Sequence, residues 1–421
     1  MKKNQIMNKF LGYRCSICND EFPFTSEIYT CPNDNGNLDV ILDSGTIRRK
    51  YEVSDITSRR EESLWRYLPL LPVNDPGGQG TPLRATGFTP LYSPDALKNA
   101  LGLRDFWIKD EGRNPTGSFK DRASAIVISR AQEINADVIV TASTGNAGAA
   151  LAGLSAAVGQ KAVIFAPKTA PPAKIAQLLI YGAKVILVDG NYDAAFDLSI
   201  EASREFGWYC RNTGFNPFTV EGKKTAAFEI WEQVVLGESM SHKPISIFVS
   251  VGDGNIISGI HKGFKDLIDL GWIEHMPRLF GVQSEGSSAV ANAFNQSTEE
   301  ILPVKSNTIA DSISVDLPRD GLRGLRAAVQ TKGSYLTVSD QKILNSIASL
   351  GKVGIFTEPA GAAAYAGLVK AIENGIINAS DPVVMINTGN GLKDVRAAML
   401  AVSEAAVIEP SLDSLKRLLQ I

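Results

Sequence analysis

The sequence predicts an α/β protein with two subdomains built on mostly parallel sheets. From about residue 105 onward, short apolar runs rich in β-branched residues alternate with longer Ala-rich segments of helical spacing. Turns that contain glycine separate the two kinds of segment, which is typical of parallel sheets crossed by helices. The chain has 421 residues, more than a single core usually spans, so we expect the βα units to form two sheets.

Each predicted element follows from its own pattern. Continuous apolar runs of strand length predict strands at 105–110, 137–143, 161–167, 184–190, 244–252, 278–286 and 382–390. Ala-rich segments of helical period predict helices at 121–134, 146–159 and 171–182. Before them, EESLWRYL at 61–68 predicts one more helix, followed by a long loop rich in Pro and Gly. The smaller subdomain is expected at about 120–215, inserted in the larger one.

Composition excludes several classes of function. Lys and Arg number 42 and Asp and Glu 45, so net charge gives no reason to expect nucleic acid or a membrane surface as a partner. Apolar runs are too short to span a bilayer, and MKKNQIMNKFLGYRCS at the N-terminus lacks a signal-peptide core, so we expect a cytoplasmic protein. The three histidines, His242, His261 and His275, are scattered, which argues against a histidine-dependent triad.

The first 45 residues differ from the rest and predict a zinc-ribbon-like module in front of a catalytic unit at 46–421. Cys15, Cys18, Cys31 and Asp34 form a C-x2-C-x12-C-x2-D pattern. Paired cysteines on two turns present zinc ligands tetrahedrally, although an aspartate among thiolates is uncommon in structural sites. Two interpretations stay open: a zinc ion held by these four residues, or a ribbon that has lost its metal and folds by docking on the main unit.

The segment KDEGRNPTGSFKDRA at 109–123 contains a candidate reactive lysine. Lys120 follows a Gly-Ser-Phe turn and opens a helix, where the helix dipole lowers the pKa of an amine. A neutral amine suits a lysine that forms a Schiff base. The alternative is a structural lysine that pairs with Asp121 or Glu111 at the helix start.

Two further helix starts can bind anions. Ser143, Thr144, Gly145 and Asn146 lie where a predicted strand gives way to a helix, so their hydroxyls and N–H groups can hold a carboxylate. The alternative there is a simple capped turn. The loop at 252–256, GDGNI, lies between a buried strand and a helix and predicts a phosphate cup. A dinucleotide loop is the rival interpretation, but the third glycine of G-x-G-x-x-G is absent.

A fourth segment, VVMINTGNGLKD at 383–394, delivers Thr388 into a Gly-rich turn, and EPAGAAAYAGL from Glu358 supplies another helix start at the same end of the sheet. A reactive lysine, a partner for a ring hydroxyl, a cup for one phosphate and a hydroxyl for a ring nitrogen together match pyridoxal 5′-phosphate. The expected partner is therefore a small amino-acid substrate.

These segments also resemble a known family. GRNPTGSFKDR, STGN, EGKKTAAFEI, GDGN, the EPA segment and TGNGLKD resemble those of the threonine synthases, in the fold-type II pyridoxal-phosphate enzymes. The resemblance covers about residues 60–400, and the cysteine module resembles the ribbon in front of many archaeal and bacterial members. It implies a fold-type II enzyme, a homodimer, and β,γ-replacement on O-phospho-L-homoserine to give L-threonine and phosphate.

The resemblance also implies a role for each matching residue. Lys120 is the Schiff-base lysine and general base, Phe119 packs against the cofactor ring and Asn146 bonds the ring hydroxyl. Thr388 meets the pyridine nitrogen, where a hydroxyl favours elimination and replacement over transamination. The substrate carboxylate is bound by Ser143, Thr144 and Gly145. The cofactor phosphate is bound by the backbone of Gly252, Asp253, Gly254, Asn255 and Ile256.

The chain departs from the family where the substrate's phosphate is bound. Ala147 stands where the family usually has Thr, Thr219 where Arg is expected, and Lys223 where Gln is usual, and 212–225 contains one extra residue. Losing an arginine removes charge-assisted bonds worth about 1.5–3 kcal/mol. Four cations are candidates to replace it: Lys174, Arg211, Lys223 and Lys224. The alternative is a dehydratase or β-replacement enzyme on an unphosphorylated hydroxy amino acid such as threonine or serine; an oxidoreductase or a non-catalytic paralogue fits the motifs less well.

Overall fold

The computed structural model describes residues 9–25, 27–236 and 243–421. Two features discussed above lie outside the described residues. They are residues 1–8, part of the N-terminal stretch in which we expect no signal peptide, and His242. Within the described ranges, no helix combines the length and the apolar character needed to cross a membrane.

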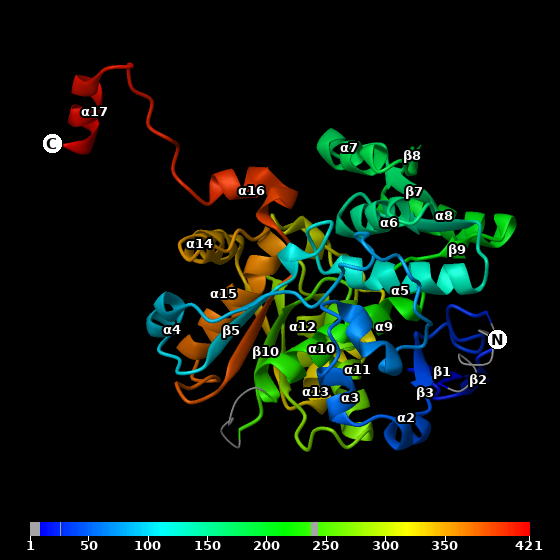
Figure 1. Ribbon diagram of the computed structural model, residues 1–421. Helices are drawn as coiled ribbons and strands as arrows, with labels where there is room; N and C mark the ends of the chain where they lie inside the picture. The colour runs from blue at the N-terminus through cyan, green and yellow to red at the C-terminus, as the bar shows by residue number, and fades with distance from the viewer. Residues whose placement is uncertain (1–8, 26, 237–242) are drawn as a thin grey trace.

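The N-terminal module is a three-stranded antiparallel sheet in the order β2-β1-β3. Its strands are β1 (Phe10–Cys15), β2 (Glu21–Pro23) and β3 (Leu38–Leu42). Phe10 and Tyr13 of β1 pack edge-on against Phe218 of helix α9 (Phe218–Lys223), with ring centroids 5.7 and 6.5 Å apart. The module therefore shares its hydrophobic core with the catalytic unit (Figure 1).

The larger sheet has six strands in the order β12-β11-β10-β13-β5-β4, and only β4 is antiparallel to its neighbour. The strands are β12 (Ser334–Val338), β11 (Arg278–Ser284), β10 (Ser246–Ser250), β13 (Val383–Asn387), β5 (Phe106–Asp110) and β4 (Leu91–Tyr92). The strands predicted at 105–110, 244–252, 278–286 and 382–390 are confirmed. Two strands of this sheet, β12 and β4, were not predicted.

The smaller sheet is entirely parallel, in the order β8-β7-β6-β9. Its strands are β6 (Val138–Ala142), β7 (Lys161–Pro167), β8 (Lys184–Val188) and β9 (Tyr209–Cys210). The chain leaves the larger sheet after β5 and returns to it at β10, so the smaller sheet is formed in between. The predicted α/β class with two mostly parallel sheets is confirmed, whereas the domain boundaries at 45, 120 and 215 stay predictions.

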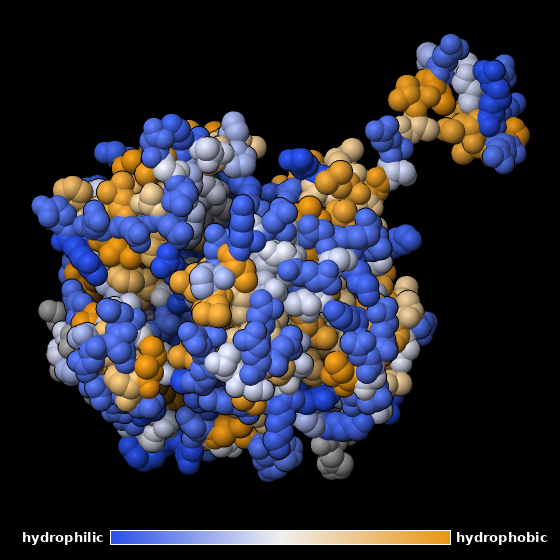
Figure 2. All heavy atoms as spheres, turned by 180° about the vertical axis from the view of Figure 1, so that it is seen from behind, coloured by the Kyte–Doolittle hydropathy of each residue, from blue (hydrophilic) through white to orange (hydrophobic). Residues whose placement is uncertain are grey.

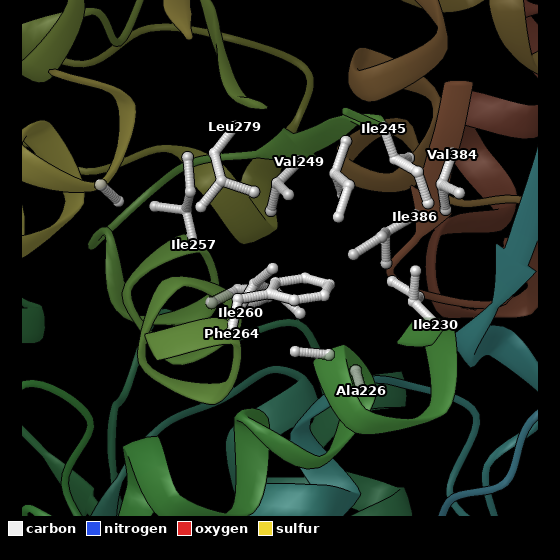
Figure 3. Packing of buried hydrophobic residues seen from close by; sticks show 14 of the residues in the cluster. Ala226, Ile230, Ile245, Val249, Ile257, Ile260, Phe264, Leu279, Val384 and Ile386 are labelled. Carbon is white, nitrogen blue, oxygen red and sulfur yellow. The ribbon is translucent and has the colours of Figure 1, made fainter. Parts of the chain in front are cut away.

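Helices cover both faces of the larger sheet. Alternate residues of β10 point to opposite sides. Ile247 and Val249 pack under helices α10 (Thr225–Ile230) and α11 (Asn255–Asp269), whereas Phe248 belongs to the core beneath α15 (Pro359–Glu373). Figure 3 shows the first of these cores, where Ile260 and Phe264 of α11 meet the side chains of the sheet. Every residue of β10 is buried, as expected for a parallel strand covered by helices on both faces.

The α-helices of the described chain have the following bounds: α2 (Ser44–Lys50), α3 (Val53–Thr57), α4 (Asp95–Leu101), α5 (Lys120–Glu133), α6 (Asn146–Ala156), α7 (Pro172–Ile180), α8 (Tyr192–Phe206), α9, α10 (Thr225–Ile230), α11 (Asn255–Asp269), α12 (Ala289–Asn295), α13 (Gly321–Gln330), α14 (Asp340–Gly351), α15 (Pro359–Glu373), α16 (Val395–Leu400) and α17 (Leu412–Leu419). The helices predicted at 121–134, 146–159 and 171–182 correspond to α5, α6 and α7. Figure 1 shows α17 standing apart from the body of the chain.

The helix predicted over 61–68 differs from the structure. A 3₁₀ helix, Leu64–Leu70, is found instead, and Glu61 and Glu62 precede it. Ser63 caps its start by accepting a hydrogen bond from the Trp65 N–H, and Pro69 lies inside it. Because proline cannot donate the backbone bond of an α-helix interior, a short, tight helix is the result.

A buried ionic cluster joins the first turn of α5 to the larger sheet. Arg122 of α5 donates to Glu111, which follows β5, at 2.6 Å, and also pairs with Glu229 of α10. Lys109 of β5 lies 2.7 Å from the same Glu229, and all four side chains are fully buried. Burial alone would raise the pKa of Glu229, but Arg122 and Lys109 lower it to about 2, so the carboxylate stays ionised.

We predict that Arg122→Ala lowers the free energy of unfolding by about 3–5 kcal/mol, because two carboxylates lose their shared buried partner. Chemical denaturation measures the change. Arg14→Ala is the control, since its pair with Glu21 is more than half exposed and should contribute no more than about 1 kcal/mol. Equal effects of the two substitutions would contradict the importance of the cluster.

Candidate active site

The backbone places Lys120 beside the turn that follows β13. The Phe119 N–H donates to the Thr388 carbonyl at 2.9 Å, and the Asn390 N–H donates to the Gly117 carbonyl at 2.9 Å. Lys120 and Thr388 consequently line the same cavity, together with the loop at 252–256. Three of the four segments singled out in the sequence therefore converge, at the carboxyl ends of β10 and β13.

Lys120 opens α5, as predicted, and it is half-buried and lines the cavity. Burial lowers its pKa, and the nearby Arg211 guanidinium lowers it further, against the opposing carboxylates of Glu358 and Asp253. The alternative role, a structural lysine paired with Asp121 or Glu111, is not seen among the described residues. Asp121 accepts from the Thr116 N–H at 2.6 Å instead, and Glu111 pairs with Arg122. The geometry favours a lysine kept partly as a neutral amine.

The loop at 252–256 is built to hold an anion. No hydrogen bond within the described part of the chain takes up the backbone N–H groups of Gly252 to Ile256, and helix α11 begins at Asn255. Gly254 has φ of 92°, and a Cβ there would meet the Asp320 carbonyl oxygen at 2.5 Å, so only glycine fits. The Asp253 carboxylate accepts from the Arg319 N–H at 3.2 Å. Free N–H groups at a helix start suit a phosphate.

The remaining segment, residues 143–146, lies at the edge of the cavity. Asn146, at the start of α6, lines it, whereas Thr144 and Gly145 line an adjoining hollow that shares Asn146 and Glu358 with it. Ser143 accepts from the Gly145 N–H at 3.2 Å and is not part of either lining. The structure thus brings three of these four residues to the site.

Phe119 lies away from the cavity surface. Its ring is fully buried in the core, with the Arg122 guanidinium 5.6 Å from the ring centroid. Its expected contact with a cofactor ring stays a prediction.

Several residues at the site were not identified from the sequence as functional. The Glu358 carboxylate accepts from the Asn146 amide at 2.8 Å, and burial raises its pKa. Ser250, at the end of β10, has its hydroxyl 3.4 Å from that of Thr388. Thr213 and Ser312 also line the cavity. A charged residue just before a buried Ala-rich helix was the available signal for Glu358, whereas no local pattern distinguishes the three hydroxyl residues.

The cavity carries the chemical groups that pyridoxal 5′-phosphate requires. It combines a lysine with lowered pKa, a row of free N–H groups for one phosphate and the hydroxyl pair of Thr388 and Ser250. These are the groups that hold this cofactor's carbonyl carbon, phosphate and ring.

The cysteine module gathers its four predicted ligands. One ligand atom from each of Cys15, Cys18, Cys31 and Asp34 lies within 4.8 Å of all the others. The Cys18 and Cys31 sulfurs are 3.7 Å apart, and Cys15 Sγ lies 3.3 Å from Asp34 Oδ1. Ligand separations of about 3.5–4 Å are those of tetrahedral zinc with Zn–S bonds near 2.3 Å. The structure therefore provides a metal-sized cluster.

Comparison with known proteins agrees with the geometry. Residues 83–389 match the family model described as pyridoxal-phosphate dependent enzyme. The threonine synthase of Methanocaldococcus jannaschii is 38% identical over 410 residues, covering 97% of this chain and 99% of that protein. The threonine synthase of Methanosarcina acetivorans is 34% identical over 409 residues, covering 96% and 97%.

Solved structures show the same fold at lower identity. The processed form of threonine deaminase isoform 2 from Solanum lycopersicum has a TM-score of 0.63 and 22% identity, covering 75% of this chain and 88% of that one. Maize serine racemase has a TM-score of 0.61 and 24% identity, covering 72% and 88%. The match over most of the chain to the family model and to relatives above 30% identity means that this protein belongs to the pyridoxal-phosphate-dependent enzymes and, within them, to the threonine synthase family.

Proposed function

We propose that this chain is a threonine synthase that converts O-phospho-L-homoserine and water to L-threonine and phosphate. The observation that carries the proposal is one cavity in which Lys120 faces the free backbone N–H groups of Gly252 to Ile256. Threonine synthases that match along nearly the whole chain support the choice of reaction.

The residues of the cavity have distinct proposed roles toward the cofactor. When bound, pyridoxal 5′-phosphate supplies an electron sink conjugated to the substrate's amino group. The backbone of Gly252 to Ile256 would hold its phosphate, Lys120 its carbonyl carbon, and Asn146 its ring hydroxyl. Thr388, with Ser250 beside it, would meet the ring nitrogen. Because a hydroxyl does not stabilise a positive charge there as a carboxylate would, the site favours elimination and replacement.

Lys120 would move the protons of the reaction. Because its pKa is lowered, part of Lys120 is a neutral amine. This amine can take a proton from Cα of the substrate and later give a proton back to a substrate carbon atom. Thr144 and Gly145, with Ser143 behind them, would orient the substrate through its carboxylate at the start of α6. Cβ also loses a proton, phosphate leaves from Cγ, and the hydroxyl of water adds at Cβ. Protons return to Cα and Cγ to complete L-threonine, and the second hydrogen of water stays with the released phosphate.

A second candidate activity has one observation in its favour. Ala147 and Thr219 offer no charge where the family places phosphate-binding groups, and Thr219 donates to the Asn216 carbonyl inside the protein at 2.8 Å. This neutrality would suit a dehydratase or a β-replacement enzyme acting on threonine or serine. The two candidates differ in the product released.

We predict that the purified, cofactor-loaded enzyme releases inorganic phosphate from O-phospho-L-homoserine faster than it releases ammonia from threonine or serine. Lys120→Ala should abolish both reactions and the absorbance band of the lysine–cofactor Schiff base, because the amine proposed to form it is removed. Lys161→Ala, at an exposed ion pair, is the control and should change neither. Ammonia release without phosphate release would replace the proposal by the second candidate.

We also propose that the cysteine module binds one zinc ion through Cys15, Cys18, Cys31 and Asp34. Three soft thiolates prefer zinc to hard cations such as magnesium. Elemental analysis should find one zinc per chain in the wild type and much less in Cys18→Ser. Cys210→Ser removes a buried cysteine that belongs to no such cluster and should keep the metal. Less than a trace of zinc in the wild type would discard the site in favour of a metal-free ribbon.

We propose that the enzyme is a homodimer. The segment after α16 extends away from the body of the chain and carries exposed apolar side chains, which Figure 2 shows on the projecting arm. They include Val407, Leu412, Leu415, Leu418 and Ile421. A second copy of the chain would cover them, since large apolar patches are usually buried. Sedimentation equilibrium measures the mass of the assembly and therefore the number of chains in it.

That the protein acts in the cytoplasm stays an expectation from the sequence.

A further inference from the structure

Arg211 is a buried cation without an anion. It follows β9, and its side chain is fully buried. Its Nη1 donates to Thr213 Oγ1 at 2.7 Å and its Nε to Ser124 Oγ at 3.2 Å. Nη2 has no hydrogen-bond partner, and no carboxylate of the described chain lies within ion-pair distance. Burying a guanidinium without a charged partner costs free energy, unless a bound anion accepts its free hydrogen bonds and neutralises its charge.

Lys223 is a second buried cation of the same kind. Its side chain is fully buried, and its amine donates to Asn255 Oδ1 at the start of α11. Among the residues that the structure describes, no carboxylate forms an ion pair with it. Burial, then Lys120 and then Arg211, lower its pKa well below the usual value. Lys120 and Lys223 therefore line one cavity, and Arg211 lies behind it, bonded to Thr213, which also lines the cavity.

The other candidate cations are already paired or lie elsewhere. Lys224 lies 2.6 Å from Glu221 and 2.7 Å from Asp266. Lys174 pairs with Asp311 at the adjoining hollow. Because carboxylates already neutralise Lys224 and Lys174, neither lysine needs a bound anion.

We propose that Arg211 and Lys223, assisted by the Thr213 hydroxyl, bind the phosphoryl leaving group of the substrate. The inference rests on the proposed function and deepens it. Thr213 and Lys223 line the cavity beside Lys120, so a phosphate held there lies near the amine that moves protons. The N–H groups of Gly252 to Ile256 already suit the cofactor's phosphate, which leaves these two cations for a second phosphate.

The test compares Arg211→Met and Lys223→Gln with the wild-type holoenzyme. We expect each change to lower kcat/KM for O-phospho-L-homoserine roughly 10- to 100-fold, as loss of one charge-assisted contact implies. Calorimetry with inorganic phosphate should show a similar loss of affinity. The dissociation constant of pyridoxal 5′-phosphate from the apoenzyme should change less than about threefold. Lys161→Gln is the matched control for Lys223→Gln.

Further variants keep the result interpretable. Arg211→Lys retains the charge and should recover part of the phosphate affinity, which a fold defect would not allow. Lys174 and Lys393 both line the adjoining hollow, so Lys174→Ala and Lys393→Ala test it, and a larger loss of phosphate affinity there would overturn the proposal. So would a loss of cofactor affinity with unchanged affinity for inorganic phosphate, because the cations would then serve the cofactor. If the wild type released no phosphate from the substrate, the proposed function would fail, whereas phosphate calorimetry would still decide whether the anion site exists.

Discussion

The buried ion cluster around Arg122 is the constraint on which the position of the active lysine depends. Lys120 and Arg122 lie in the same turn of α5, and Arg122 is bonded to Glu111 and Glu229 in the interior. Since Glu111 follows β5 and Glu229 belongs to α10, the cluster fixes the start of the lysine helix against the larger sheet. Removing one partner from such a cluster leaves an uncompensated charge, so the helix cannot shift without a large cost.

A second constraint is electrostatic and belongs to the cavity itself. Burial and the Arg211 guanidinium lower the pKa of both Lys120 and Lys223, and no hydrogen bond within the described residues takes up the backbone N–H groups of the loop at 252–256. Folding alone does not satisfy these groups. A site with this surplus of donors and positive charge is organised for ligands that carry phosphate. The phosphates of the cofactor and the substrate would together bind these free N–H groups and buried cations.

Much of the fold and part of the candidate site could be predicted from the sequence. The seven predicted strands and three Ala-rich helices follow from local periodicity, and the helix start at Lys120 follows from its Gly-Ser-Phe turn. The 3₁₀ helix at Leu64–Leu70 was mistaken for an α-helix because Pro69 lay just beyond the predicted segment. The state of Arg211 could not be predicted, since a missing partner depends on residues distant in the chain. For the same reason, the sequence offered four cations for the phosphate without distinguishing them.

The identity of the lysine that binds the cofactor tests the account most directly. Lys120 and Lys223 line the same cavity, and burial lowers the pKa of both, so either amine is chemically competent. Borohydride reduction of the holoenzyme followed by peptide mass mapping locates the attachment. We predict the phosphopyridoxyl group on Lys120, in the peptide that contains GSFKDR. Attachment to Lys223, or no attachment to either lysine, would contradict it.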